Sequence, residues 1–211
     1  DAGDDSAACE LYAQEVHHED DASVSLAKLI GLAVTQQEGK PSSLYELGQT
    51  LFGCIDGMEL YQQWLQRLEV PLTHVPLKDV VWYGVDISEM FNELSVLMHQ
   101  DYTVNTMTDP ADLPGQLDVF FSKGVTLLYA VRDLNQLFET LETGRIAVFD
   151  YSFTFSDGED TTIGSGKTVR YLNLVAFLEQ LETKERILYV KTQTSRVDPK
   201  TGRVWLDCVY A

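Results

Sequence analysis

Residues 80–98 read VVWYGVDISEMFNELSVLM, in which a nearly continuous apolar run ends at Asp86 and apolar residues then recur at helical spacing. A strand with almost no polar residue is typical of a parallel sheet that is covered on both faces. This stretch therefore predicts a strand, a turn at Asp86 and a helix, which together form one strand–helix unit.

The same unit recurs on both sides of this stretch. Upstream, residues 44–47 predict a strand, the glycines at 48 and 53 a turn, and residues 58–68 a helix. Downstream, the pattern predicts strands at 102–107, 117–121 and 145–151, helices at 134–141 and 172–181, and a mobile loop rich in glycine and aspartate at 156–167.

The end of the chain has a different pattern. Two apolar runs, 187–190 and 204–210, flank the turn sequence Asp198-Pro199-Lys200-Thr201-Gly202, which predicts a hairpin. Alternating strands and helices form parallel units with right-handed crossovers. The predicted fold class is α/β: a Rossmann-like doubly wound sheet, mostly parallel with an antiparallel C-terminal hairpin strand, and helices on both faces.

Length and charge limit the function classes. A chain of 211 residues predicts a single domain over 1–211, in which two helices within 1–40 are expected to form a lid. The formal net charge of -18 repels phosphate backbones and anionic lipid surfaces, so we expect neither nucleic acid nor membrane as a partner.

Cysteine usage and the N-terminus bear on localisation. Cys9, Cys54 and Cys208 are an odd, scattered set with no disulfide framework, which favours a reducing cytoplasm. The chain begins with acidic residues, where a secretory signal would be positively charged, and no apolar run approaches the roughly 20 residues that span a bilayer.

Ligands of open α/β sheets bind beyond the carboxyl ends of the strands, near the point where the strand order reverses. The candidate residues are therefore the turn from Glu46 to Gly53, Asp86, Asp109 to Leu113, and Ser122. Glycine lets the backbone approach a ligand, and a carboxylate accepts two hydrogen bonds from ribose hydroxyls. This combination predicts a nucleoside site.

These motifs, in this order, resemble the class I S-adenosylmethionine-dependent methyltransferases over roughly residues 22–210. The likeness rests on Glu46-Leu47-Gly48 with Gly53, on residues 81–88, and on Asp109-Pro110-Ala111-Asp112-Leu113-Pro114 followed by the strand to 121. The resemblance implies S-adenosylmethionine as cofactor, with Asp86 on the ribose hydroxyls. It also implies that Asp109 or the adjacent backbone faces adenine, and that Glu46 and Gly48 face the methionine part. The turn departs from the family, because Gln49, Thr50, Leu51 and Phe52 separate its glycines.

The candidate catalytic residues are Tyr151 and Ser122, and Ser122 is also a candidate for cofactor binding. An aromatic face attracts a sulfonium cation, and Tyr151 ends the predicted strand at the catalytic edge, whereas Tyr129 fits a core pattern equally well. The four histidines have no metal-ligand spacing, so no metal is expected, and neither a serine-hydrolase elbow nor a phosphate-binding loop occurs.

Three functions remain open. The first is methyl transfer to a small molecule, as in small-molecule biosynthesis. The second is a lyase reaction in which the cofactor's own amino nitrogen displaces sulfur, giving azetidine-2-carboxylate and methylthioadenosine. The third is a non-catalytic binding or interaction domain, which the divergent turn from Gly48 to Gly53 suggests.

Overall fold

The computed structural model describes residues 43–48, 52, 55–56, 58–59, 62–63, 77–122, 126–156, 158–163, 166–197 and 200–211. The predicted lid helices within 1–40, most of the predicted helix at 58–68, and Gly53 lie outside the described residues.

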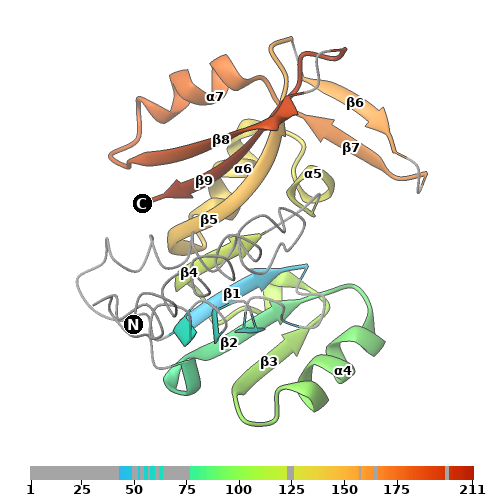
Figure 1. Cartoon of the computed structure of the whole chain (residues 1–211), viewed down its shortest axis with the longest axis vertical. Helices are drawn as coiled ribbons and strands as arrows, with labels where there is room; N and C mark the ends of the chain where they lie inside the picture. The colour runs from blue at the N-terminus through green and yellow to red at the C-terminus, as the bar shows by residue number, and fades with distance from the viewer. Residues whose placement is uncertain are drawn as a thin grey trace, which may run out of the picture.

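A seven-stranded sheet forms the centre of the molecule, in the order β3-β2-β1-β4-β5-β9-β8 (Figure 1). Its strands are β1 (Ser43–Leu47), β2 (Val81–Val85), β3 (Thr103–Met107), β4 (Leu117–Ser122), β5 (Gly144–Phe153), β8 (Leu188–Val197) and β9 (Val204–Tyr210). Strands β1 to β5 pair in parallel, and β9 runs antiparallel to both β5 and β8. The predicted fold class is confirmed, and the strand order reverses between β1 and β4.

Helix starts follow from side chains that cap them. Ser88, Asp133 and Asn173 each accept a backbone N–H of the first turn and so begin α4 (Glu89–Met98), α6 (Leu134–Leu141) and α7 (Leu174–Leu181). The other helical segments are α5 (Thr126–Ala130) and the short 3-10 helices η2 (Leu77–Asp79) and η3 (Pro110–Asp112). Within the described residues, no helix is both long and apolar enough to cross a membrane.

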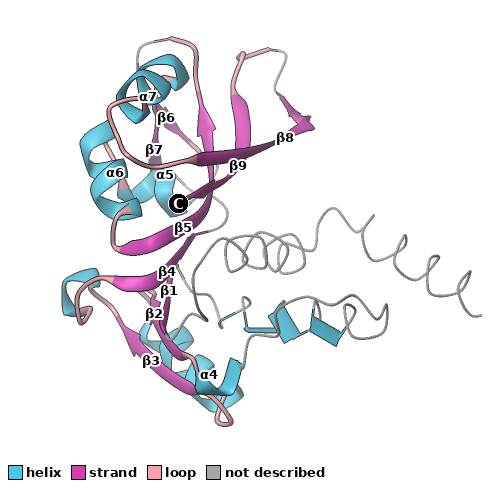
Figure 2. Cartoon of the chain, turned by 90° about the vertical axis from the view of Figure 1, so that its left-hand side faces the viewer, coloured by secondary structure: helices cyan, strands magenta, loops and turns pink. Residues whose placement is uncertain are grey.

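The two faces of the sheet carry separate apolar clusters, because successive strand residues point in opposite directions. On β4, Phe120 joins the cluster that α5, α6 and α7 cover, whereas Val119 and Phe121 join the opposite cluster. Figure 2 shows α5, α6 and α7 together on one side of β5 and β9. Helix α4 belongs to the other face, where its C-cap His99 packs edge-on against Phe52 of the second cluster.

Two expectations for the segment after β4 were wrong. Strand β5 continues to Phe153, and the predicted mobile loop at 156–167 contains β6 (Glu159–Thr162), which pairs antiparallel with β7 (Thr168–Tyr171). Gly166 forms a tight turn between these strands, since it has φ of +76° and donates its N–H to the Ile163 carbonyl over 2.8 Å. The polar sequence of β6 lacks the apolar alternation that would have predicted a strand.

Candidate functional site

The strand ends of the parallel sheet lie level at one edge. Leu47 of β1 is in register with Val85 of β2 and with Ser122 of β4, and Val85 is in register with Met107 of β3. Two backbone hydrogen bonds continue this row. The N–H of Gly48 donates to the Val85 carbonyl at 2.7 Å, and the N–H of Asp86 donates to the Met107 carbonyl at 3.2 Å. The structure therefore brings Glu46, Gly48, Asp86 and Ser122 together where the strand order reverses.

Asp86 has a carboxylate that is only partly used by the protein. One oxygen, Oδ1, accepts the backbone N–H of Ser88 at 2.8 Å, and Ser88 itself caps α4 by accepting from Phe91. The other oxygen has no hydrogen-bond partner among the described residues. Ile87, the next residue, is 82% exposed and adds apolar surface beside this carboxylate. Helix capping therefore does not account for Asp86.

Ser122 carries a buried hydroxyl at the same edge. The residue is 1% exposed, and its Oγ has no hydrogen-bond partner within the part of the chain that the structure describes. A buried hydroxyl without a partner is costly, and such a group commonly marks a ligand or water position. Ser122 thus offers a buried hydroxyl to a ligand at this edge.

The turn after β1 is filled by protein side chains. Gly48 has φ of +67°, and a Cβ there would lie 2.7 Å from Oγ1 of Thr126, at the start of α5. Phe52 also adopts a left-handed conformation, with φ of +49°, and its side chain is fully buried. Glu46 is 6% exposed beneath the turn, and Gly53 lies outside the described residues. The side chain of Thr126 thus packs directly against Gly48.

Asp109 lies at the rim of the edge and is exposed. Its Oδ1 accepts the Ala111 N–H at 2.9 Å and so caps η3. The next residue is Pro110, which has no backbone N–H to offer. Residue 110 therefore cannot donate a backbone hydrogen bond to a base.

Tyr151 does not present its ring to the edge, which corrects its expected role. Its ring is 0% exposed and packs 4.8 Å from Phe153, and its hydroxyl donates to the Arg170 carbonyl of β7 at 2.6 Å. Burial raises the pKa of this phenol far above its ordinary value. The expectation failed because β5 is longer than predicted and the β6–β7 hairpin covers its end.

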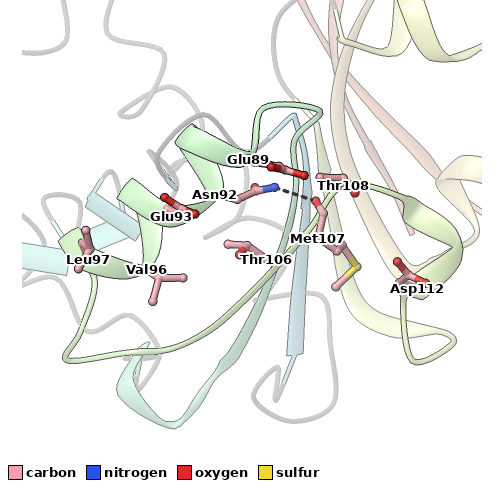
Figure 3. A pocket seen from close by; sticks show the side chains of 9 residues that line it. All are labelled: Glu89, Asn92, Glu93, Val96, Leu97, Thr106, Met107, Thr108 and Asp112. Carbon is pink, nitrogen blue, oxygen red and sulfur yellow. Dashed lines mark hydrogen bonds between the residues drawn. The ribbon is translucent and has the colours of Figure 1, made fainter.

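A groove of about 730 Å³ lies beside this edge, between α4 and β3 (Figure 3). Its lining comes from two segments: Glu89, Asn92, Glu93, Val96 and Leu97 of α4, and Thr106, Met107, Thr108 and Asp112 of β3 and the turn after it. Asn92 binds the helix to the sheet, because its Nδ2 donates to the carbonyls of Asp86 and Met107 at 3.0 and 3.3 Å. Sequence reasoning missed this asparagine, although a polar residue within an apolar helical stretch was a usable signal.

Comparison with known proteins gives structural neighbours only. No family model and no curated protein matches the sequence. The N-terminal domain of EvdMO1, solved with S-adenosylhomocysteine (SAH) bound, is similar at a TM-score of 0.58 and 15% identity, over 90% of this chain and 80% of that one.

Two further solved structures are methyltransferases. The 1,6-didemethyltoxoflavin-N1-methyltransferase of Burkholderia thailandensis, with 1,6-didemethyltoxoflavin and S-adenosylhomocysteine bound, has a TM-score of 0.52 and 14% identity over 97% of this chain and 88% of that one. Coclaurine N-methyltransferase, bound to N-methylheliamine and SAH, has a TM-score of 0.55 and 8% identity over 90% of this chain and 72% of that one. The chain therefore has the fold of the S-adenosylmethionine-dependent methyltransferases.

Proposed function

We propose that the protein binds S-adenosylmethionine at the shared edge of β1, β2 and β4 and transfers its methyl group to a small molecule. The observation that carries this proposal is the carboxylate of Asp86, which lies, like Gly48, one residue beyond the row Val85–Leu47–Ser122 and has one oxygen with no hydrogen-bond partner among the described residues. Ligands of doubly wound sheets bind at this place.

The residues of the edge suit the nucleoside end of this cofactor. The second oxygen of Asp86 would accept hydrogen bonds from ribose hydroxyls, and the exposed Ile87 beside it offers an apolar surface for the base. The Ser122 hydroxyl would find in the ligand the partner that the described protein groups do not supply. Bound S-adenosylmethionine supplies an already activated methyl group, so the chain's own contribution is to position the reactants and exclude water.

The negative charge of the protein favours a cationic cofactor and a small-molecule acceptor that is cationic or neutral. Glu46 lies near the end of β1, and Asp86 and Asp109 follow the ends of β2 and β3; carboxylates at these strand ends favour a cationic cofactor by local attraction. The net charge of -18 disfavours nucleic acid as methyl acceptor. Two of the similar structures hold small molecules beside the cofactor product, namely 1,6-didemethyltoxoflavin and N-methylheliamine. We therefore propose a small-molecule acceptor. The scattered cysteines, which form no disulfide framework in the sequence, support a cytoplasmic location.

A second candidate function has its own observation. Thr126 packs against Gly48, and the buried ring of Phe52 belongs to the apolar cluster on the opposite face of the sheet. A turn occupied in this way favours a domain that binds a partner protein and not the cofactor. The two candidates make different predictions for cofactor binding.

One experiment separates the candidates. The full chain is titrated with S-adenosylmethionine in a calorimeter, and the protein is then incubated with this cofactor alone and the products are identified by mass spectrometry. Binding that is lost in Asp86→Ala, with intact cofactor recovered, supports methyl transfer. Methylthioadenosine released without an acceptor favours the lyase reaction, and absence of binding favours the interaction domain.

A further inference from the structure

Helix α4 buries a polar side. Its buried residues are Asn92 and Ser95, and its C-cap His99 is 4% exposed. Each of the three is hydrogen-bonded: Asn92 donates to two strand-end carbonyls, Ser95 donates to the Phe91 carbonyl at 2.7 Å, and the His99 ring lies 3.0 Å from the Ser95 carbonyl. Of these contacts, those of Asn92 tie the helix to the strand ends, and the other two lie within the helix.

The outward side of α4 is apolar. This outer surface of α4 consists of Met90, Leu94, Val96, Leu97 and Met98, which are 39–62% exposed. A surface helix usually has the opposite arrangement, with its apolar stripe turned to the core. Contiguous apolar residues left in solvent mark an interaction site more often than a plain surface does.

The groove next to this surface adds negative charge. Val96 and Leu97 line both the outer surface of α4 and the groove, where Glu89, Glu93 and Asp112 provide carboxylates (Figure 3). The groove follows β3, which lies at the end of the strand order and, among the described strands, pairs only with β2. Apolar contact area and acidic groups thus occur side by side on one accessible edge.

We propose that the outer surface of α4 and its groove bind an amphipathic helical segment of a partner protein that carries leucine-like and Lys or Arg side chains. Apolar anchors would cover Leu94 and Leu97, and basic side chains would pair with Glu89 and Glu93, which is the helix-in-groove mode of recognition. A second copy of this chain is disfavoured, because two molecules of charge -18 repel each other. An anionic membrane surface is disfavoured for the same reason.

The test uses the full chain and a synthetic 18-residue amphipathic peptide of leucine and lysine, labelled for fluorescence anisotropy. The variant Leu94→Gln/Leu97→Gln should bind the peptide at least about tenfold more weakly, because two apolar contacts are lost. The matched control is Val175→Gln/Leu178→Gln, which changes two exposed apolar residues of α7 and should bind like the parent protein. Circular dichroism verifies that both variants are folded.

Charge is tested separately. Glu89→Gln/Glu93→Gln should weaken binding and flatten its dependence on salt, and a leucine–glutamate peptide should not bind. Equal weakening in the α4 and α7 variants, equal binding of the acidic peptide, or no binding at all would overturn the proposal. So would a dimer in sedimentation velocity that disappears with Leu94→Gln/Leu97→Gln, because the surface would then serve a second copy.

Discussion

Thr126 lies so close above Gly48 that a Cβ at residue 48 would stand 2.7 Å from its Oγ1 and 2.9 Å from its Cγ2. Gly48 also has φ of +67°, a backbone conformation that residues with a Cβ adopt only with strain. Glycine is therefore required twice at this position, once for conformation and once for space. The contact joins the end of β1 to the start of α5.

We expect Gly48→Ala to destabilise the protein by about 1–3 kcal/mol, because it adds both backbone strain and a side-chain clash. Thr126→Ala in the same chain should restore the part that is due to the clash and leave about 1 kcal/mol due to φ. Urea unfolding of the two single variants and the double variant measures the coupling. Strictly additive effects would show that Thr126 moves aside at no cost.

The ribose role of Asp86 predicts a loss of affinity without a matching loss of stability. Asp86→Ala should weaken S-adenosylmethionine binding by about 2–3 kcal/mol, or roughly 30- to 150-fold, because a charged acceptor of two hydrogen bonds is removed. Calorimetry on the parent and variant proteins measures this difference.

The control for Asp86 is its neighbour Ser88, which caps α4. Ser88→Ala should lower the free energy of unfolding by about 1 kcal/mol and leave the dissociation constant nearly unchanged. If the two variants affect affinity equally, Asp86 acts only by ordering the start of α4.

Ser122 gives a prediction in which stability and affinity change in opposite directions. Ser122→Ala removes a buried hydroxyl that has no described partner, so the unfolding free energy should stay constant or rise by up to about 1 kcal/mol. Cofactor affinity should fall about two- to tenfold, since one neutral hydrogen bond is lost. Thermal unfolding measures the change in stability, and calorimetry on the same samples measures the change in affinity. Unchanged affinity would show that Ser122 does not contact the cofactor.

The sequence predicted the sheet well because its strands are strongly patterned. The apolar run at 80–85 and its terminal Asp86 became β2 and the residue after it, and the hairpin signal near Gly202 became β8 and β9. Strand ends that share one edge follow from parallel topology, so the sequence pattern was enough to place Gly48, Asp86 and Ser122 together.

Pattern alone could not show what covers each strand end. Tyr151 was predicted to be a ligand contact, but its burial depends on the β6–β7 hairpin, whose first strand has no apolar alternation. In the same way, the apolar residues of α4 correctly predicted a helix, but periodicity cannot tell which side of a helix faces the sheet. Asn92 and its two carbonyl partners decide that orientation.

The packing role of Tyr151 is tested by removing its hydroxyl. Tyr151→Phe should lower the free energy of unfolding by about 0.5–1.5 kcal/mol, because the hydrogen bond to the Arg170 carbonyl is lost while the ring stays packed on Phe153. Affinities for S-adenosylmethionine and for its demethylated product should both remain unchanged in calorimetry. A selective loss of binding to the cationic cofactor would show that Tyr151 contacts the cofactor after all.

Tyr210 predicts a defined loss of stability at alkaline pH. Burial, followed by the nearby Glu142 carboxylate, raises the pKa of its phenol from 10.0 to about 12, although Arg186 over the ring lowers it. The folded state therefore holds the phenol proton more tightly than the unfolded chain. This contribution to stability is complete below pH 10 and is lost as pH rises from about 10 through about 12.

Tyr210→Phe cannot ionise, so its unfolding free energy should fall less steeply than that of the parent protein above pH 10. Below pH 10 the variant should be less stable by a roughly constant amount, since the hydrogen bond from the Tyr210 hydroxyl to Glu142 is missing. Urea unfolding at intervals from pH 8 to pH 11.5 measures both effects as the difference between the two proteins. That difference is needed because burial also raises the pKa of Tyr45 and Tyr151. Glu142→Gln removes the nearby negative charge and should give an intermediate slope, whereas parallel curves for the parent and Tyr210→Phe would show that this phenol titrates alike in the folded and unfolded chains.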